Sequence, residues 1–271
     1  MMKRMATRKV PTESYGVLAR NVTSTSLDLC VEELSIKGFT ILNGGYSSKV
    51  IDEIKQGSVA AKKKYIQRYG FDDLEEIGES NTVRSPSNFI GKGVFTDLFE
   101  NDRLITTLKN YIQNQVLLLQ QNIIFNPPKQ SYGAGRWHRD LPYQHFISSK
   151  PLAVNALFAV DDFTANNGAT WVLAGSHKTE NFPSEEYIIE NAEQIFVPAG
   201  NFLVLDAMLF HCGGANQTNS ARIGINHVFG IPYFAQQIKI SDIASSSELA
   251  KPTAHGYETI TSFLSGRRKT K

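Results

Sequence analysis

In the second half of the chain, apolar residues, continuous or alternating with polar ones, occur in short runs. Each run is four to nine residues long and predicts a β-strand; the runs are Leu117–Phe125, Leu152–Val160, Thr170–Leu173, Phe202–Leu205 and Arg222–Phe229. Clusters rich in Asn, Pro and Gly separate the runs and predict turns. Strands at this spacing are typical of an all-β sandwich or barrel.

The first half of the chain carries apolar residues at helical spacing instead. The pattern predicts helices over residues 26–38 and 48–68 and further helical spacing within 96–119, with a short strand over 39–42. Helices that precede strands in this way favour helices packed outside one β core over a doubly wound sheet. The predicted fold class is therefore mainly β with flanking helices.

This pattern divides the chain into three parts. Residues 1–25 form a polar N-terminal segment, and residues 26–240 form a single domain whose N-terminal part is helical. Residues 241–271 form a C-terminal segment that ends in the basic tail Gly266–Lys271. We expect chain ends of this kind to be solvated.

Composition excludes several classes of partner. The formal charge of +2 gives no argument for binding nucleic acid or an anionic membrane surface. The N-terminus does not resemble a signal peptide, and no run approaches the roughly 20 apolar residues of a membrane span. Two cysteines, Cys30 and Cys212, do not suggest a disulfide framework, so we expect a cytoplasmic protein. The phosphate-binding motifs GxGxxG and Walker A do not occur.

His138 and Asp140 are the first candidates for chemistry. They lie two residues apart, so on an extended strand their side chains project from the same face. With 6 His and 11 Asp in 271 residues, a His-x-Asp match arises by chance in about one such chain in four. A strand histidine is more often a hydrogen-bonded structural residue than a ligand, so this motif alone does not establish a metal site.

His211 adds a second imidazole to this pair. It follows the apolar stretch 202–210 and precedes a glycine-rich turn, which predicts a position at the end of a strand. Two histidines and one carboxylate on one face, with other coordination positions open, form the facial triad of non-haem Fe(II) oxygenases.

Arg222 opens the last predicted strand. It shares a face with Gly224, Asn226 and Val228, and a face of this composition lines a polar cavity more naturally than a packed core. A buried arginine needs an anionic partner, and its planar fork matches a carboxylate. The partner is either a carboxylate-bearing cosubstrate or a nearby acidic side chain in a structural salt bridge.

The remaining histidines and one cysteine have simpler interpretations. His145, His177, His227 and His255 are predicted to be structural or solvent-facing, and His227 lies on the strand face opposite Arg222. Cys212 neighbours His211, but adjacent strand residues point apart. We therefore expect Cys212 to be a small buried residue.

These motifs together resemble the phytanoyl-CoA dioxygenase family of Fe(II)- and 2-oxoglutarate-dependent oxygenases. Four elements carry the resemblance in the family's order: Trp137-His138-Arg139-Asp140, Asn167-Gly168-Ala169-Thr170 with Gly175-Ser176-His177, His211-Cys212-Gly213-Gly214-Ala215-Asn216, and Arg222 eleven residues after His211. The resemblance covers roughly residues 30–235. The four elements in order are far more specific than any one of them.

The resemblance implies a double-stranded β-helix, a cupin-like jelly roll of two facing sheets with N-terminal helices packed outside. It implies Fe(II) held by His138, Asp140 and His211. It also implies O₂ and 2-oxoglutarate as cosubstrates, with the far carboxylate of 2-oxoglutarate bound by Arg222.

The resemblance also implies further site residues. Arg84 stands near the place of a second basic residue that many family members carry, and Thr170 is a candidate cofactor-binding residue. By the same alignment Asn155 and Leu157 face inward, Asn155 as a contact to substrate or cosubstrate and Leu157 where some members have tryptophan. Gln120 and Asn122, polar residues in an apolar strand, are further candidates.

The implied reaction hydroxylates an unactivated C–H bond of a small polar metabolite and releases succinate and CO₂. Halogenases of this resemblance class lack the carboxylate ligand, so Asp140 favours hydroxylation over halogenation. Polar residues expected near the mouth of the site are Arg84, Arg136, Arg139, Tyr143 and Gln144.

Two other classes stay open. One is an oxidative desaturase or epimerase of the same fold, and the other is a non-catalytic, cupin-like metal-binding protein. The sequence leaves the substrate and the oligomeric state open.

Overall fold

The fold was analysed in a computed structural model of the whole chain. It describes residues 10–91, 93–129, 135–141, 146–236 and 264–265. The expectations for Tyr143, Gln144, His145, His255 and the basic tail fall outside these residues.

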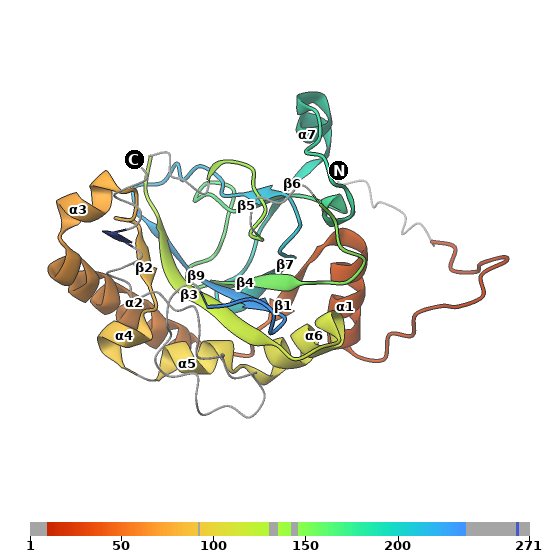
Figure 1. Cartoon of the computed structure of the whole chain (residues 1–271), viewed down its shortest axis with the longest axis horizontal. Coiled ribbons are helices and arrows are strands. Elements are labelled where there is room, and N and C mark those ends of the chain that lie inside the picture. Colours follow the sequence, from red (N-terminus) through yellow and green to blue (C-terminus); the bar gives the residue numbers. More distant parts are fainter. Residues whose placement is uncertain (1–9, 92, 130–134, 142–145, 237–263, 266–271) are drawn as a thin grey trace, which may run out of the picture.

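Two β-sheets face each other in the middle of the molecule (Figure 1). The larger sheet is antiparallel, with its strands in the order β1 (Phe39–Asn43), β7 (Asn201–Asp206), β4 (Ala153–Ala159), β9 (Arg222–Gly230), β3 (Leu117–Asn126) and β2 (Thr82–Arg84). The smaller sheet has the order β6 (Ala192–Ile195), β5 (Thr170–Leu173) and β8 (His211–Cys212). The molecule is thus a mostly antiparallel β structure with helices around it.

Helices cover the outer face of the larger sheet, as the order of the sequence patterns predicts (Figure 1). They are α1 (Ser26–Lys37), α2 (Ser48–Tyr69), α3 (Phe71–Glu76), α4 (Ser87–Ile90), α5 (Val94–Phe99) and α6 (Asp102–Ile112). The helix α7 (Glu185–Asn191) stands apart on the side of the smaller sheet, beyond the short 3₁₀ helix η2 (Ser176–Lys178). No helix in the described part of the chain is long and apolar enough to cross a membrane.

Local sequence signals explain where the helices begin and end. The Thr25 side chain accepts a hydrogen bond from the backbone of Asp28, whose carboxylate accepts one from the Thr25 backbone, so a capping box starts α1. Gly38 ends it with a φ of 84°, a left-handed conformation that favours glycine. The predicted helical spacing within 96–119 is split between two helices, because Asn101 caps a new helix, α6.

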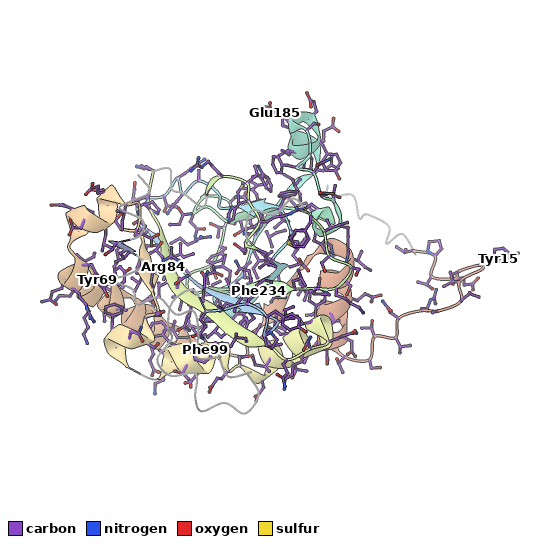
Figure 2. All side chains as sticks on the ribbon, in the orientation of Figure 1. Tyr15, Tyr69, Arg84, Phe99, Glu185 and Phe234 are labelled. Atoms are coloured by element: carbon purple, nitrogen blue, oxygen red, sulfur yellow. The ribbon has the colours of Figure 1, made fainter. Side chains whose placement is uncertain are left out.

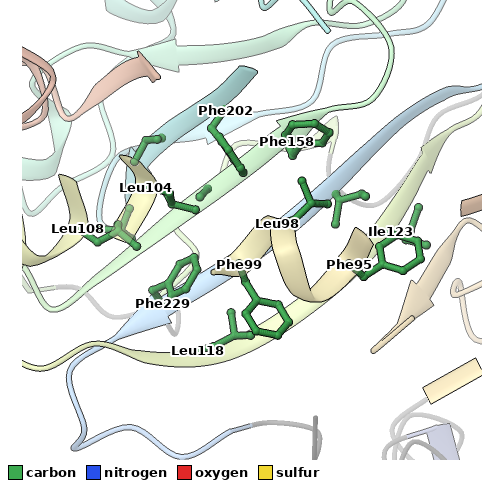
Figure 3. Packing of buried hydrophobic residues seen from close by; sticks show 14 of the residues in the cluster. Phe95, Leu98, Phe99, Leu104, Leu108, Leu118, Ile123, Phe158, Phe202 and Phe229 are labelled. Atoms are coloured by element: carbon green, nitrogen blue, oxygen red, sulfur yellow. The ribbon is translucent and has the colours of Figure 1, made fainter. Parts of the chain in front are cut away.

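One apolar core fills the space between the larger sheet and the helices. Figure 3 shows α5 and α6 contributing Phe95, Leu98, Phe99, Leu104 and Leu108, which pack against Leu118, Ile123, Phe158, Phe202 and Phe229 of the sheet. Along each strand of the larger sheet, residues of this core alternate with residues that face the smaller sheet, because successive side chains of a strand point to opposite faces. The larger sheet therefore has one face for packing and one for the interior.

The inner face of the larger sheet, which looks toward the smaller sheet, carries the polar residues that the sequence predicted there. Leu157 packs inward with Phe163 and Val172, while Ile223 and Phe229 of β9 lie on the helix side. Arg222 therefore faces the interior between the sheets, as predicted. His227 belongs to the opposite face, where its ring lies among residues of the helix-side core.

Candidate metal centre

His138, Asp140 and His211 meet between the two sheets. His138 Nε2 lies 3.7 Å from Asp140 Oδ1, and His211 Nε2 lies 3.7 Å from Asp140 Oδ2. The two imidazole rings are 4.4 Å apart between centroids, and one ligand atom from each of the three residues lies within 4.8 Å of the others. The sequence pair and the distant histidine thus form one cluster.

Backbone pairing produces this convergence. His138 and His211 form an antiparallel bridge, with N–H···O distances of 3.0 Å and 3.1 Å in the two directions. The Asp140 N–H donates to the Ala207 carbonyl at 3.0 Å. His211 also pairs with Val172 of β5, an interior residue, so its side chain points into the space between the sheets.

Both histidines are oriented by their second ring nitrogen. Nδ1 of His138 lies 2.7 Å from the Arg136 carbonyl, and Nδ1 of His211 lies 3.0 Å from the Leu209 carbonyl. A carbonyl only accepts, so each Nδ1 carries a proton, and in the neutral ring Nε2 turns its lone pair toward the cluster. Burial lowers the pKa of His211, which favours the neutral imidazole that binds metals.

Asn155 orients the carboxylate. Its side-chain amide donates to Asp140 Oδ2, and its own amide oxygen is buried with no hydrogen-bond partner in the described structure. The sequence predicted Asn155 as an inward contact to substrate or cosubstrate. The structure adds a contact to the proposed ligand itself, a role that only the three-dimensional arrangement reveals.

The donor set fits a first-row transition metal. Two imidazoles and one carboxylate, each held by a further hydrogen bond, are the ligands that non-haem Fe(II) sites use. Cys212 does not join them. It pairs with Trp171, and its side chain lies on the face of β8 opposite His211. Burial raises its pKa to about 11, so its thiol stays protonated. This agrees with its predicted role as a small buried residue.

Arg222 lies farther along the same interior. Its Nη1 donates to the Gly168 carbonyl at 3.0 Å, and its guanidinium lies 4.0 Å over the Phe163 ring centre. Only 4% of the residue is exposed. The segment that begins at Gly168 continues into β5, where Thr170 shares the face of Val172 and is buried.

Arg84 extends the inner face at its other edge (Figure 2). It lies on β2 opposite Asn122 of β3, and its guanidinium donates to both carboxylate oxygens of Glu79, at 2.9 Å and 2.8 Å. Next to it, the side-chain amides of Asn122 and Gln120 lie 3.1 Å apart. The candidates Arg84, Asn122 and Gln120 therefore lie together, and Arg84 is ion-paired with Glu79.

One expectation about a surface residue needs correction. Arg139 does not line a mouth: it is 5% exposed, and backbone carbonyls surround its guanidinium. Because it alternates with His138 and Asp140, it points away from the cluster. His177 is structural, one of the two alternatives predicted for it: it is buried, with Nε2 3.4 Å from the Ser35 carbonyl. Arg136 is exposed, as a mouth residue would be.

His227 is structural, as predicted. Its Nδ1 lies 3.0 Å from the Ala156 carbonyl and its Nε2 lies 3.0 Å from the side-chain nitrogen of Gln121. The ring is fully buried, and burial lowers its pKa to about 4.

Comparison with known proteins shows the family to which this sequence belongs. The family model of phytanoyl-CoA dioxygenase (PhyH) matches residues 35–224. The uncharacterized protein Mb1539 of Mycobacterium bovis is 27% identical over 226 residues, 79% of each chain. The iron/alpha-ketoglutarate-dependent dioxygenase ausU of Aspergillus calidoustus is 28% identical over 207 residues, 73% of this chain and 68% of its own.

Solved structures share the fold at low sequence identity. One is EctD from S. alaskensis, solved with 2-oxoglutarate and 5-hydroxyectoine, with a TM-score of 0.63 at 16% identity over 84% of this chain and 86% of that one. The alpha ketoglutarate dependent epimerase SnoN gives a TM-score of 0.60 at 16% identity, covering 85% and 91%. The family match spans most of the chain and contains the whole cluster and Arg222. The chain therefore belongs to the phytanoyl-CoA dioxygenase (PhyH) family and is an iron- and 2-oxoglutarate-dependent dioxygenase.

Proposed function

We propose that this enzyme hydroxylates a C–H bond of a small polar molecule and converts 2-oxoglutarate to succinate and CO₂. The observation that carries the proposal is the His138–Asp140–His211 cluster, whose two Nε2 atoms face the two carboxylate oxygens in the interior. We further propose that the two facing sheets form a double-stranded β-helix, a fold that encloses a site between its sheets.

The three residues of the cluster would hold iron. His138 and His211 offer their Nε2 atoms because their Nδ1 atoms bind carbonyls, and Asp140 offers a carboxylate oriented by Asn155. Iron bound there would supply activation of O₂ coupled to oxidation of 2-oxoglutarate. The protein's part is to fix three ligands on one side and leave the other side for cosubstrate and substrate.

Arg222 would bind the far carboxylate of 2-oxoglutarate. The Gly168 carbonyl and the Phe163 ring orient its guanidinium in the buried interior, where a bidentate carboxylate contact is strong. Thr170 lies along β5 between Gly168 and Val172, and Val172 pairs with His211. Its hydroxyl is therefore proposed to contact the cosubstrate between Arg222 and the metal.

The substrate would lie along the amide-rich part of the inner face. Asn226 and Asn122 pair across β9 and β3, and the side-chain oxygen of Asn226 is buried with no hydrogen-bond partner in the described structure. A ligand that brings N–H or O–H groups would satisfy it. Arg84, with its Glu79 partner, and Gln120 complete this polar wall, which supports a polar substrate.

We also propose that the enzyme works in the cytoplasm as a small-molecule enzyme. Cys30 and Cys212 are both free and buried, which suits a reducing compartment. Small-molecule chemistry fits the enclosed position of the cluster between the two sheets.

Removing a ligand tests the proposal directly. Asp140→Ala and His138→Ala should each lower Fe(II)-dependent succinate formation from 2-oxoglutarate by at least about 100-fold, more than the loss typical of an outer partner. Asp52→Ala, which removes an exposed carboxylate of α2, is the matched control and should keep the wild-type rate. A ligand variant that turned over 2-oxoglutarate at the wild-type rate would refute the assignment.

Product analysis of the same reactions separates hydroxylation from its alternatives. A metabolite panel is screened for compounds that stimulate succinate formation, and the molecular mass of each product is then measured by mass spectrometry. Hydroxylation adds one oxygen atom to the compound. Succinate without added oxygen indicates desaturation or epimerisation, and a protein that binds Fe(II) and 2-oxoglutarate without any succinate is a non-catalytic binder.

A further inference from the structure

Arg139 stands between two of the proposed metal ligands in the sequence, yet its side chain leaves the metal centre. Neighbouring residues of an extended segment point to opposite sides, so His138 and Asp140 face the interior and Arg139 enters the wall behind them. The residue is only 5% exposed. Burying a guanidinium is costly unless hydrogen bonds satisfy it, so its contacts matter.

Four backbone carbonyls receive this guanidinium. Nε donates to Met208 at 2.7 Å, Nη1 to Glu180 at 3.2 Å, and Nη2 to Ser176 at 3.2 Å and to Thr179. Three of the carbonyls belong to residues 176–180, at and just after η2, and the Ser176 carbonyl also accepts from the Thr179 N–H at 3.1 Å. Arg139 thus joins the ligand segment to two other parts of the chain.

The second of these parts leads directly into the third ligand. Met208 and Phe210 precede His211, and the Arg139 guanidinium lies 3.9 Å over the Phe210 ring centre. The Phe210 N–H donates to the Ser176 hydroxyl at 3.0 Å. The contacts of Arg139 with Met208 and Phe210 therefore fix the approach of the chain to His211.

We propose that Arg139 is the positioning residue of the metal centre. One rigid side chain sets the spacing between the segment that carries His138 and Asp140 and the turn that delivers His211. The task suits arginine, because five N–H groups in a planar fork reach carbonyls in several directions, whereas lysine donates from a single nitrogen. This inference rests on the proposed function, because it assigns Arg139 to the same metal site.

Metal binding by the full chain tests the role. Arg139→Met and Arg139→Lys are titrated with Co(II) alone, whose visible absorption bands report the geometry of its ligands. We expect Arg139→Met to raise the Co(II) dissociation constant by about 10- to 100-fold, the range for lost outer partners of metal ligands. The bands of the saturated site should change as well, and Arg139→Lys should recover only part of both effects.

A matched core variant separates positioning from a general loss of stability. Phe99→Leu removes volume from the helix-side core, where Phe99 is 1% exposed, and should lower Tm without changing Co(II) affinity by more than about twofold. If Arg139→Met does not fold, Phe210→Leu takes its place, because it removes the ring under the guanidinium.

The outcomes distinguish the two proposals. An Arg139→Met protein with wild-type Co(II) affinity and wild-type bands would overturn the role of Arg139 and leave the metal site intact. Equal weakening by Phe99→Leu would also overturn it, because the effect would then follow stability alone. A wild-type protein that binds no Co(II) would contradict the proposed function itself.

Discussion

His227 shows how one buried side chain links stability to pH. Its neutral ring donates from Nδ1 to the Ala156 carbonyl and accepts at Nε2 from the Gln121 amide, so a second proton would face a donor. Burial lowers its pKa to about 4, below the ordinary value of 6.5. The unfolded chain therefore takes up a proton first as the pH falls, and stability present above pH 6.5 is lost toward pH 4.

The prediction is a pH-dependent difference between the wild type and His227→Gln. The unfolding free energy of the wild type should fall by about 2 kcal/mol more than that of the variant between pH 7.5 and pH 5.0. Urea unfolding at both pH values measures it, and subtraction removes the contribution of every other titrating group. Parallel pH profiles for the two proteins would show that His227 does not titrate in this range.

Single residues also mark the limit of what the sequence can predict. The common face of His138 and Asp140 and the inward face of Arg222 were predictable, because a spacing of two and the alternation along β9 follow from strand geometry. The set of three iron ligands came from the resemblance to the family and stays a prediction. The bond from Asn155 to Asp140 and the carbonyl cage of Arg139 were not predictable, because each joins segments that only the folded chain brings together. Arg139 was wrongly expected at the mouth because polar side chains usually face water.

Among the elements, those with a clear apolar pattern were predicted well, and several short ones were missed. The patterns predicted α1, α2 and the strands β3, β4, β5, β7 and β9 to within a few residues. They gave no signal for β2, β6, α3, α4 or α7, which have at most seven residues, too few to show a period. The two short strands depend on pairing with other strands, such as β2 with β3.

The turn before β5 yields an element-scale prediction, because it supports Arg222 through the Gly168 carbonyl. Gly168 has a φ of +83°, and an added Cβ would lie 2.3 Å from the Gly214 carbonyl oxygen. Gly168→Ala should therefore shift this carbonyl and raise the KM for 2-oxoglutarate by about 10-fold, the loss of roughly 1.4 kcal/mol of binding. Steady-state kinetics at saturating Fe(II) measures this change.

Gly91→Ala is the control for the backbone alone. Gly91 has a φ of +80°, but an added Cβ would meet nothing within 4 Å, so only the cost of a left-handed residue, about 1–2 kcal/mol of stability, is expected. Its KM should match the wild type. The coupling between this turn and Arg222 is refuted if Gly168→Ala has the same KM and the same stability as Gly91→Ala.

At the scale of the whole molecule, the two faces of the larger sheet carry different kinds of residues. The helix side holds the apolar core (Figure 3). Arg222, Asn122 and Asn226 lie on the inner side, and the cluster lies between it and the smaller sheet. The order of helices and strands predicted helices packed outside one β core, because the apolar face of a sheet is buried against another layer. The identity of the substrate does not follow from it, because the fold is shared by enzymes with different reactions.

The central claim is that the cluster and Arg222 form one site that uses O₂ to oxidise 2-oxoglutarate. The most direct measurement is the oxygen isotope content of succinate formed by the Fe(II)-loaded enzyme under ¹⁸O₂, compared with Arg222→Leu at the same 2-oxoglutarate concentration. We predict one ¹⁸O atom in the new carboxylate of succinate, and at least about 10-fold less product from Arg222→Leu at subsaturating cosubstrate because a charged hydrogen bond is lost. Unlabelled succinate, no succinate, or an Arg222→Leu enzyme as active as the wild type would contradict the claim.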